Sequence, residues 1–411
     1  MTVSFVLDGQ QLNAKADSTI LQVVRCLGRD LPSLCSAPNL RPHGGCRLCL
    51  VEVEGSKPVA SCHTPVQEGA VYTSNSKKLT RIRRNILELI ISDHPLECLT
   101  CSANGRCDLQ RLAQEHGIRD IRYTDPKTNT PKADFSHPFI KMEMEKCIAC
   151  GRCVRGCDEV QGSHILAMAG RGFNSRVVAG NDTTLEDANC VSCGQCISQC
   201  PVGAFSDVGQ QKNGLPDTSI TTTCTYCGIG CGFIVKVKDG EVIQMEPDPS
   251  CKANKGHSCV KGRFGYSFAQ HDERLTHPLI RDENGIHQKA SWEDALGLIA
   301  GRFADVRDNY GPHGFGAISS SRCTNEENYL LQKFTRQVMQ SNSVDNCARV
   351  CHSPSAFALG ASLGTGAGTN SFEDIEVSDV IMLVGANPTE SHPVFGSRIK
   401  QAVLVGAKLI V

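Results

Sequence analysis

The spacing of apolar residues changes several times along the chain, and each spacing predicts a different element. The chain opens with alternating apolar residues, VSFVL, before a turn at Asp8-Gly9, which is typical of a strand. The following STILQVVRCLG has helical spacing, with Ser18 as the expected N-cap and Gly28 as the expected end. LCLVEVEG predicts a second strand, and KLTRIRRNILELIIS predicts an amphipathic helix.

From about residue 276 the pattern alternates between helices and buried strands. SWEDALGLIAGRFADVRD has helical spacing, whereas DVIMLVGA and AKLIV are short apolar runs. Such alternation indicates an α/β sheet. Residues 219–275 predict short strands, and DVGQQKNGLPDTS before them is rich in turn formers and predicts a linker.

Composition adds a chemical signal to these patterns. The 411 residues include 24 cysteines beside a single Trp, and the net charge is -1. This charge gives no reason to expect nucleic acid or an anionic membrane as partner. The N-terminus lacks the features of a signal peptide, and no apolar run reaches the roughly 18 residues that span a bilayer. We therefore expect a cytoplasmic protein, in which so many thiols predict metal binding rather than disulfides.

The cysteines fall into clusters, and each cluster marks a module of an α+β multidomain fold. We predict a β-grasp ferredoxin-like domain first and the start of an α/β domain last. The predicted domains are residues 1–78, 79–140, 141–210, 219–275 and 276–411.

The first cluster has the spacing C-x10-C-x2-C-x12-C. It consists of Cys35, Cys46, Cys49 and Cys62, called the Cys35 site below. Two ligands lie close together in a glycine-bounded loop, and one lies well away on each side. Together with the ferredoxin-like strand pattern, this predicts a [2Fe–2S] cluster, which needs four converging thiolates. Zinc or free thiols are the alternative.

The second cluster follows the amphipathic helix and includes one histidine. It consists of His94, Cys98, Cys101 and Cys107, called the His94 site. Three Cys and one His are an ordinary zinc set, so spacing alone leaves zinc open. The position between two iron–sulfur modules favours a [4Fe–4S] cluster, because a zinc ion there would carry no electrons.

A repeat of C-x2-C-x2-C-x3-C, 43 residues apart, is the strongest signal in the chain. The second copy ends in Cys-Pro, as in bacterial two-cluster ferredoxins, where the fourth cysteine of each copy binds the other cluster. This crossing predicts two [4Fe–4S] sites. The Cys147 site would comprise Cys147, Cys150, Cys153 and Cys200, and the Cys190 site would comprise Cys190, Cys193, Cys196 and Cys157.

The last cluster predicts a further [4Fe–4S] centre in the small β module. This Cys224 site comprises Cys224, Cys227, Cys231 and Cys259, with Cys251 as a competing fourth ligand. Lys261 follows closely and is either a solvated surface lysine or a cation between this cluster and a second redox cofactor.

Five cysteines stay outside these sites. Cys26, Cys323 and Cys347 are expected to be small buried apolar residues. Cys351 differs because His352 follows it, although a lone Cys-His pair is more often structural.

The order of the sites resembles the catalytic subunit of cytosolic, NAD(P)-linked, metal-dependent formate dehydrogenases, of the molybdopterin oxidoreductase family. The first four modules are also shared with [FeFe]-hydrogenases, and the first two resemble the large iron–sulfur subunit of respiratory complex I. CTYCGIGC and CVKGRFG look like the start of a molybdopterin oxidoreductase, and SSSRCTNEENYLLQKF, NCARVCHSP and GANPTESHP resemble the formate dehydrogenase branch.

The resemblance implies the roles of several residues. Cys351 would bind molybdenum or tungsten, with His352 as the active-site histidine. The metal would be held by two molybdopterin guanine dinucleotides. Lys261 would lie between the Cys224 site and a pterin and count among the catalytic residues. The remaining expected pterin contacts are Arg322, Asn325, Gly385, Asn387, Ser391 and His392.

The resemblance also implies reversible oxidation of formate to CO2 and a flavin- and NAD-binding iron–sulfur partner of diaphorase type. Glycines in SLGTGAGTN look superficially like a dinucleotide loop, but the full fingerprint is missing. Family members continue for several hundred residues beyond Val411 and carry a formate-binding arginine there, so we expect either a fragment that is inactive alone or a site that a separate chain completes. The alternatives are a non-catalytic electron-transfer subunit and another molybdopterin oxidoreductase.

Overall fold

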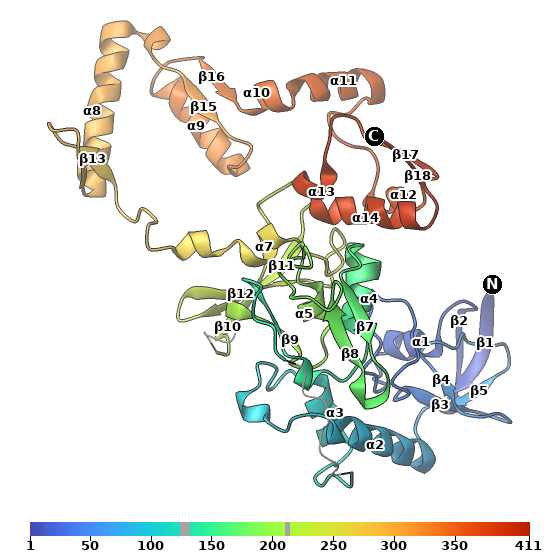
Figure 1. Ribbon diagram of the computed structural model, residues 1–411. Helices are drawn as coiled ribbons and strands as arrows, with labels where there is room; N and C mark the ends of the chain where they lie inside the picture. The colour runs from blue at the N-terminus through green and yellow to red at the C-terminus, as the bar shows by residue number, and fades with distance from the viewer. Residues whose placement is uncertain (124–131, 210–213) are drawn as a thin grey trace. The chain divides into compact units, whose positions relative to one another are not determined.

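The computed structural model describes residues 1–123, 132–209 and 214–411, and part of the predicted linker, 210–213, lies outside the described residues. The chain forms two compact units (Figure 1). One comprises Met1–Ser267 with Phe372–Val411, and the other comprises Phe268–Ser371. The boundaries of the five predicted domains stay predictions, and the last of these domains, 276–411, includes parts of both units. Among the described residues, no helix is both long and apolar enough to cross a membrane.

The N-terminal region of the first unit is a five-stranded sheet with one helix, in the strand order β2-β1-β5-β3-β4. Its elements are β1 (Thr2–Leu7), β2 (Gln10–Lys15), α1 (Ile20–Cys26), β3 (Leu50–Val53), β4 (Val59–Ala60) and β5 (Val71–Thr73). The expected turn at Asp8-Gly9 and the strand at 48–55 are confirmed. The expected N-cap was wrong, because Thr19 caps α1 in place of Ser18: Gln22 N donates to Thr19 Oγ1 at 3.3 Å, and Thr19 N donates to Gln22 Oε1 at 2.8 Å.

The amphipathic helix predicted next is α2 (Lys77–Ser92), capped by Ser76, whose Oγ accepts from Leu79 N at 3.2 Å. Leu79, Leu87 and Ile91 are buried, as helical spacing requires. Two short helices, η1 (Cys98–Thr100) and α3 (Asp108–Glu115), follow and carry the His94 site.

The internal repeat of the sequence is also a repeat of the backbone. Its two copies begin α4 (Arg152–Arg155) and α5 (Gln195–Gln199). Ala149 and Ser192 both have positive φ (51° and 54°), and Gly151 and Gly194 follow at φ 69° and 71° as N-caps. The other elements are β6 (Ile140–Met142), η2 (Met144–Lys146), η3 (Gly156–Gln161), β7 (Leu166–Ala169), η4 (Gly172–Asn174), β8 (Arg176–Ala179) and β9 (Phe205–Asp207). Strand β6 pairs with β9 and β7 with β8, both antiparallel.

A three-stranded antiparallel sheet and a βαβ segment complete the first unit. The sheet is β10 (Thr218–Thr223), β11 (Gly232–Lys238) and β12 (Glu241–Pro247), followed by α7 (Val260–Phe264). The later elements are α12 (Phe372–Glu376), β17 (Val380–Met382), α13 (Pro388–Ser391), α14 (Pro393–Leu404) and β18 (Lys408–Ile410). Strands β17 and β18 are parallel and lie on either side of α14 in the chain, which confirms the α/β pattern there. The expectation that both strands are buried was wrong, because only Ile381 of β17 is buried and β18 is exposed.

The second unit contains its own βαβ segment, with parallel β15 and β16 joined by α9. Its elements after η5 (Ser267–Gln270) are β13 (Leu279–Arg281), β14 (His287–Lys289), α8 (Trp292–Tyr310), η6 (Pro312–Gly314), β15 (Ala317–Ser319), α9 (Asn325–Gln337), β16 (Val344–Asn346), α10 (Ala348–Cys351) and α11 (Ser353–Leu363). Helix α8 confirms the helix predicted from SWEDALGLIAGRFADVRD, and Ser291 caps it, since its side chain accepts a hydrogen bond from Asp294 N.

Candidate functional site

The four thiols of the Cys35 site lie together beside the N-terminal sheet. Cys46 N donates to Cys35 Sγ at 3.4 Å, and Leu34 N donates to Cys46 Sγ at 3.4 Å. Hydrogen bonds from Cys46 and then Cys62 hold the pKa of Cys35 far below its usual range. A hydrogen bond from Cys62 is the largest cause that lowers the pKa of Cys49 to about 6. The same hydrogen bonds, together with burial, raise the pKa values of Cys46 and Cys62, because each of these thiols donates its proton within the group. The four thiols therefore lie within hydrogen-bonding reach of one another.

The His94 site lines one small cavity. All four of its members lie in the wall of that cavity, together with Lys146. Backbone amides point at two of its sulfurs: Ala103 N donates to Cys101 Sγ at 3.5 Å, and Gln110 N donates to Cys107 Sγ at 3.4 Å. A Cβ added at Gly203 would lie 2.5 Å from Cys101 Sγ, so this site adjoins the turn after Cys200.

The structure brings the repeated cysteines together in the crossed arrangement. Burial and then the charges of Cys200 and Cys147 raise the pKa of Cys150 to about 12. Burial and then the charges of Cys157 and Cys190 raise the pKa of Cys193 to about 12. The fourth cysteine of each copy therefore lies with the first three of the other copy.

Further contacts belong to the same two sites. The four members of the Cys190 site line one small cavity. Ala149 N donates to Cys147 Sγ at 3.3 Å, and Ser192 N, at the equivalent repeat position, donates to Cys190 Sγ at 3.4 Å. The positive φ of Ala149 and Ser192 turns these amides toward the sulfurs, where they stabilise negative charge.

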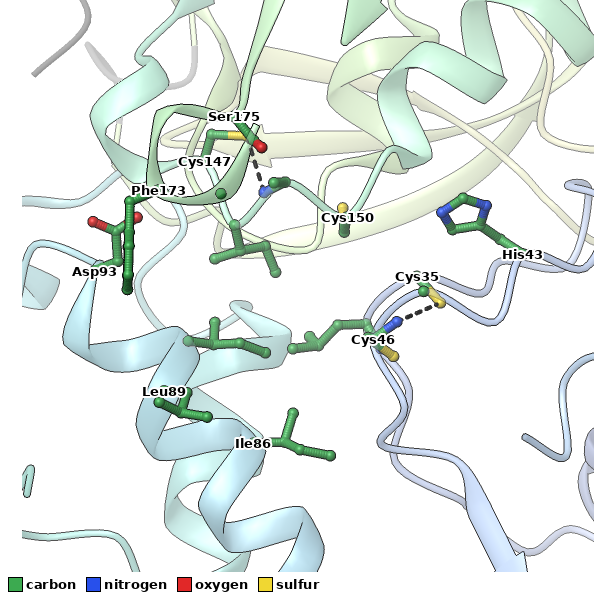
Figure 2. Close-up of a pocket in the computed structure, with 16 residues that line it drawn as sticks. Cys35, His43, Cys46, Ile86, Leu89, Asp93, Cys147, Cys150, Phe173 and Ser175 are labelled. Carbon is green, nitrogen blue, oxygen red and sulfur yellow. Dashed lines mark hydrogen bonds between the residues drawn. The ribbon is translucent and has the colours of Figure 1, made fainter. Parts of the chain in front are cut away.

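One larger cavity joins the Cys35 and Cys147 sites. It has a volume of about 480 Å³, and its wall includes Cys35, Cys46, Cys147, Cys150 and His43. Figure 2 shows the His43 ring beside Cys150 and Cys35, with apolar side chains of α2 lining the opposite wall. These two predicted cluster sites are thus neighbours within the first unit.

At the Cys224 site, Cys224, Cys227 and Cys231 lie in the connection between β10 and β11, and Cys259 directly precedes α7. Burial and then the charges of Cys224, Cys227 and Cys259 raise the pKa of Cys231 to about 12. Cys251 is also near Cys231, but its Sγ donates to the carbonyl of Gly230 at 3.8 Å. The four predicted ligands are therefore together, with Cys251 at their edge.

Lys261 lies between this site and the predicted pterin-contact segment. Its charge lowers the pKa of Cys224, against the larger raising effect of burial, and its Nζ donates to the carbonyl of Glu390 at 3.2 Å. Around Glu390, Ser391 Oγ donates to Asn387 O at 2.9 Å and lies 2.9 Å from His392 Nδ1. Gly385 has φ +59°, which suits a glycine at the turn after β17.

The second unit carries Cys351 and His352, both exposed, between α10 and α11. His352 Nε2 lies 3.1 Å from the carbonyl of Gly366, which places the proton on Nε2 and leaves Nδ1 as an acceptor. Arg322 and Asn325 lie in the same unit, on the loop before α9 and at its first residue. Lys261 and the 385–392 segment belong to the other unit.

The expectations for three unassigned cysteines need correction. Cys26 and Cys323 are exposed rather than buried. Cys347 is half-buried and hydrogen-bonded, since its Sγ accepts from Ser321 N at 3.2 Å and donates to Ser321 Oγ at 3.3 Å. These bonds lower the pKa of Cys347. None of the 24 cysteines, all of which lie in described residues, forms a disulfide.

Sequence reasoning missed Arg263, which lies in the same CVKGRFG motif as Lys261. Its side chain is 1% exposed, and its charge faces Cys193 and Cys196 of the Cys190 site. The available signal was a cation four residues after a predicted ligand, at the spacing of one helical turn.

Sequence profiles of five protein families match this chain, and together they cover most of it. They are the 2Fe-2S iron-sulfur cluster binding domain at residues 1–77, the NADH-ubiquinone oxidoreductase-G iron-sulfur binding region at 83–122, the NADH-quinone oxidoreductase subunit 3 ferredoxin-like domain at 137–206, the molybdopterin oxidoreductase Fe4S4 domain at 217–271 and the molybdopterin oxidoreductase at 274–411.

Several proteins are similar to this chain over almost all of its length. A protein of Bacillus subtilis named "Putative formate dehydrogenase YrhE" is 34% identical over 100% of this chain and 46% of its own length. A "Putative formate dehydrogenase" of Staphylococcus aureus is 32% identical over 98% of this chain and 45% of its own length. This chain thus spans about half the length of these relatives. A chain of an NAD+-reducing [NiFe]-hydrogenase in the H2-reduced state, 34% identical, covers 50% of this chain and 87% of its own, with a TM-score of 0.44.

The order of domains defines a class: a redox protein in which ferredoxin-type iron–sulfur domains precede a molybdopterin domain. Residues 217–411 match the two molybdopterin oxidoreductase families, and the similar proteins from Bacillus subtilis and Staphylococcus aureus are named as putative formate dehydrogenases.

Proposed function

We propose that the chain carries electrons through one [2Fe–2S] and four [4Fe–4S] clusters, held at the five sites described above. The observation that carries this proposal is the gathering of thiols far apart in sequence, above all the crossing of Cys157 and Cys200. Amide hydrogen bonds to cysteine sulfurs at four of the sites supply the stabilisation that cluster thiolates use.

The contacts favour clusters over zinc. Within the described residues, no group of three or more His, Cys, Asp or Glu side chains is placed to hold a single metal ion. A zinc ion needs its ligands within about 2.3 Å of one centre, whereas the ligands of a cluster attach to different irons and stand farther apart. At the Cys35 site, hydrogen bonds join Cys35 to both Cys46 and Cys62, and join Cys62 to Cys49, so the four thiols form one connected group.

The neighbouring sites suggest an order of electron transfer within the first unit. The Cys147 site adjoins the Cys35 site through their shared cavity and adjoins the His94 site through Gly203. The Cys190 site interleaves with the Cys147 site through the crossed ligands. Electrons from the Cys224 site would therefore pass the Cys190 and Cys147 sites before they reach the Cys35 site.

We further propose that the complete enzyme oxidises formate to CO2, reversibly, and passes two electrons into this path. Cys351 would supply a thiolate ligand to molybdenum or tungsten held by two molybdopterin guanine dinucleotides, a group that accepts both electrons. His352, with Nδ1 available as an acceptor, would take the proton or orient formate. The proposed contacts to the pterins are Lys261, Arg322, Asn325, Gly385, Asn387, Ser391 and His392. Lys261 is also a proposed catalytic residue, together with Cys351 and His352.

The proposed partner is a flavin- and NAD-binding iron–sulfur subunit of diaphorase type, with NAD as the final acceptor. Two matching families have NADH-linked oxidoreductases in their names, and both lie in the N-terminal half of this chain. The Cys35 site would be nearest to that partner. We also propose a cytoplasmic location.

A non-catalytic electron-transfer role is the second candidate. It is favoured by the exposure of Cys351 and His352, since a catalytic metal site excludes water. Molybdenum and tungsten analysis of the natural assembly separates the two candidates: metal near one per chain supports catalysis, and its absence supports electron transfer alone.

Iron analysis of anaerobically purified protein tests the cluster proposal. Two irons in one [2Fe–2S] cluster and four in each of four [4Fe–4S] clusters give about eighteen per chain. A content of roughly ten or fewer irons, accompanied by zinc, would contradict the assignment of the middle sites.

A further inference from the structure

A buried arginine links two of the proposed cluster sites. Arg263 lies on α7, which begins directly after the ligand Cys259. Its side chain is 1% exposed, and its NH1 donates to Ser198 Oγ on α5 at 2.6 Å. The backbone of Arg263 therefore lies close to the Cys224 site, and its guanidinium contacts the helix that carries Cys196 of the Cys190 site.

The loop of the Cys190 site is shaped to admit this side chain. A Cβ added at Gly194, between Cys193 and Cys196, would lie 2.8 Å from Arg263 Cζ and would also collide with its Cδ and Nε. Two further hydrogen bonds fasten the same segments: Ser258 Oγ donates to Cys193 O at 2.8 Å, and Gln195 Nε2 donates to Gly256 O at 2.9 Å. Close packing and hydrogen bonds thus hold the segments of the two sites together.

The guanidinium keeps one donor unused. Arg263 Nε is buried and has no hydrogen-bond partner among the described residues. Burying a polar N–H without a partner is costly, so buried donors normally have an acceptor. The side chain stacks its guanidinium 5.6 Å over the Phe264 ring, which fixes its plane, and its charge faces Cys196 and Cys193.

We propose that Arg263 raises the reduction potential of the [4Fe–4S] cluster at the Cys190 site, by placing its charge and its free Nε–H against the cluster's sulfur atoms. This inference rests on the proposed function, because it requires a cluster at that site. A cluster gains one negative charge on reduction, and a nearby cation and N–H···S hydrogen bonds stabilise the reduced state more than the oxidised state. Asp207 and Glu246 also face Arg263 and offset part of its charge.

The raised potential would make this cluster the favoured electron acceptor next to the Cys224 site. Arg263 is therefore a tuning residue, not a catalytic residue, since it touches neither the proposed substrate nor the proposed pterin. Its effect should appear in one cluster's potential and leave the others unchanged.

The test is a redox titration followed by EPR on the anaerobically purified full chain, comparing wild type with Arg263→Gln. At the wild-type midpoint potential, we expect the ratio of reduced to oxidised cluster to fall about tenfold in one [4Fe–4S] component, which is about 59 mV for a one-electron couple. Lys15→Gln is the control, because it removes one positive charge at an exposed position of β2 in the N-terminal sheet. It should shift no component.

An unshifted Arg263→Gln protein with full iron content would overturn the proposal and leave the proposed function standing. If Arg263→Gln loses four irons, Arg263→Lys decides, because lysine keeps the charge but lacks the Nε–H. A smaller downward shift of the same component supports the proposal, and an unshifted iron-replete Arg263→Lys protein overturns it. Wild-type protein without a cluster at this site would instead refute the proposed function.

Discussion

The internal repeat allows a sharp test of how Arg263 and its loop fit together. Gly151 and Gly194 hold equivalent positions, both as N-caps, with φ 69° and 71°. Alanine at either position should cost roughly 1–2 kcal/mol, because an L-residue is strained in the left-handed region. A Cβ at Gly151 would meet only His43 Nε2, at 4.0 Å, whereas one at Gly194 would press into the buried Arg263 side chain.

Gly194→Ala should therefore destabilise its loop more than Gly151→Ala does. The clash adds about 1–3 kcal/mol, the usual cost of overpacking, which corresponds to roughly 5–150-fold in an opening equilibrium. Hydrogen exchange measured by mass spectrometry on peptides covering 190–200 and 147–157 would report both loops in the same molecule. Equal increases in exchange for the two variants would refute the packing of Arg263 over Gly194.

Three further predictions concern other parts of the chain. Arg83→Met should accelerate hydrogen exchange in β3 by the equivalent of about 2–4 kcal/mol, because the buried guanidinium donates to Leu48 O, Leu50 O and Ser74 O at 3.1, 2.9 and 2.9 Å. The control Arg81→Met, at an exposed position of the same helix, should change exchange little. His137 is buried and accepts hydrogen bonds from the amides of Phe139 and Ile140, and burial lowers its pKa. The unfolded chain therefore binds more protons, and the free energy of unfolding should fall as the pH drops below about 6.5. Hydrogen exchange at these two amides, corrected for intrinsic rates, should show a pH slope that His137→Gln removes. In the complete enzyme, Cys351→Ala should abolish formate-dependent dye reduction and leave the iron content unchanged. Cys347→Ala should lose only the hydrogen bonds with Ser321 and keep its activity. The reverse result would move the proposed metal ligand to Cys347.

Much of the architecture could be predicted from local patterns. Helical spacing located α2 and α8, and alternation located the first strands, because periodicity directly records which face is buried. Caps were less certain: adjacent Ser18 and Thr19 offer similar hydroxyls, and the reciprocal bond with Gln22 decides for Thr19.

Cysteine spacing predicted which thiols would gather, since cluster ligands in one loop are set by short stretches of chain. The crossing of Cys157 and Cys200 was predictable for the same reason, from a repeat visible in the sequence. The burial of single cysteines was not predictable: Cys26 occupies a core-type helical position but is exposed, because burial depends on which other segments pack against the helix.

The sequence by itself thus predicted which thiols gather, the order of domains and most elements, all of which depend on short stretches of chain. Only the tertiary structure decided which sites adjoin and which cations face them. Arg263 and Ser198 are 65 residues apart, and their hydrogen bond depends on how two folded segments pack, which no local pattern encodes. The same holds for the cavity shared by Cys35 and Cys147, since its walls come from three separate parts of the chain.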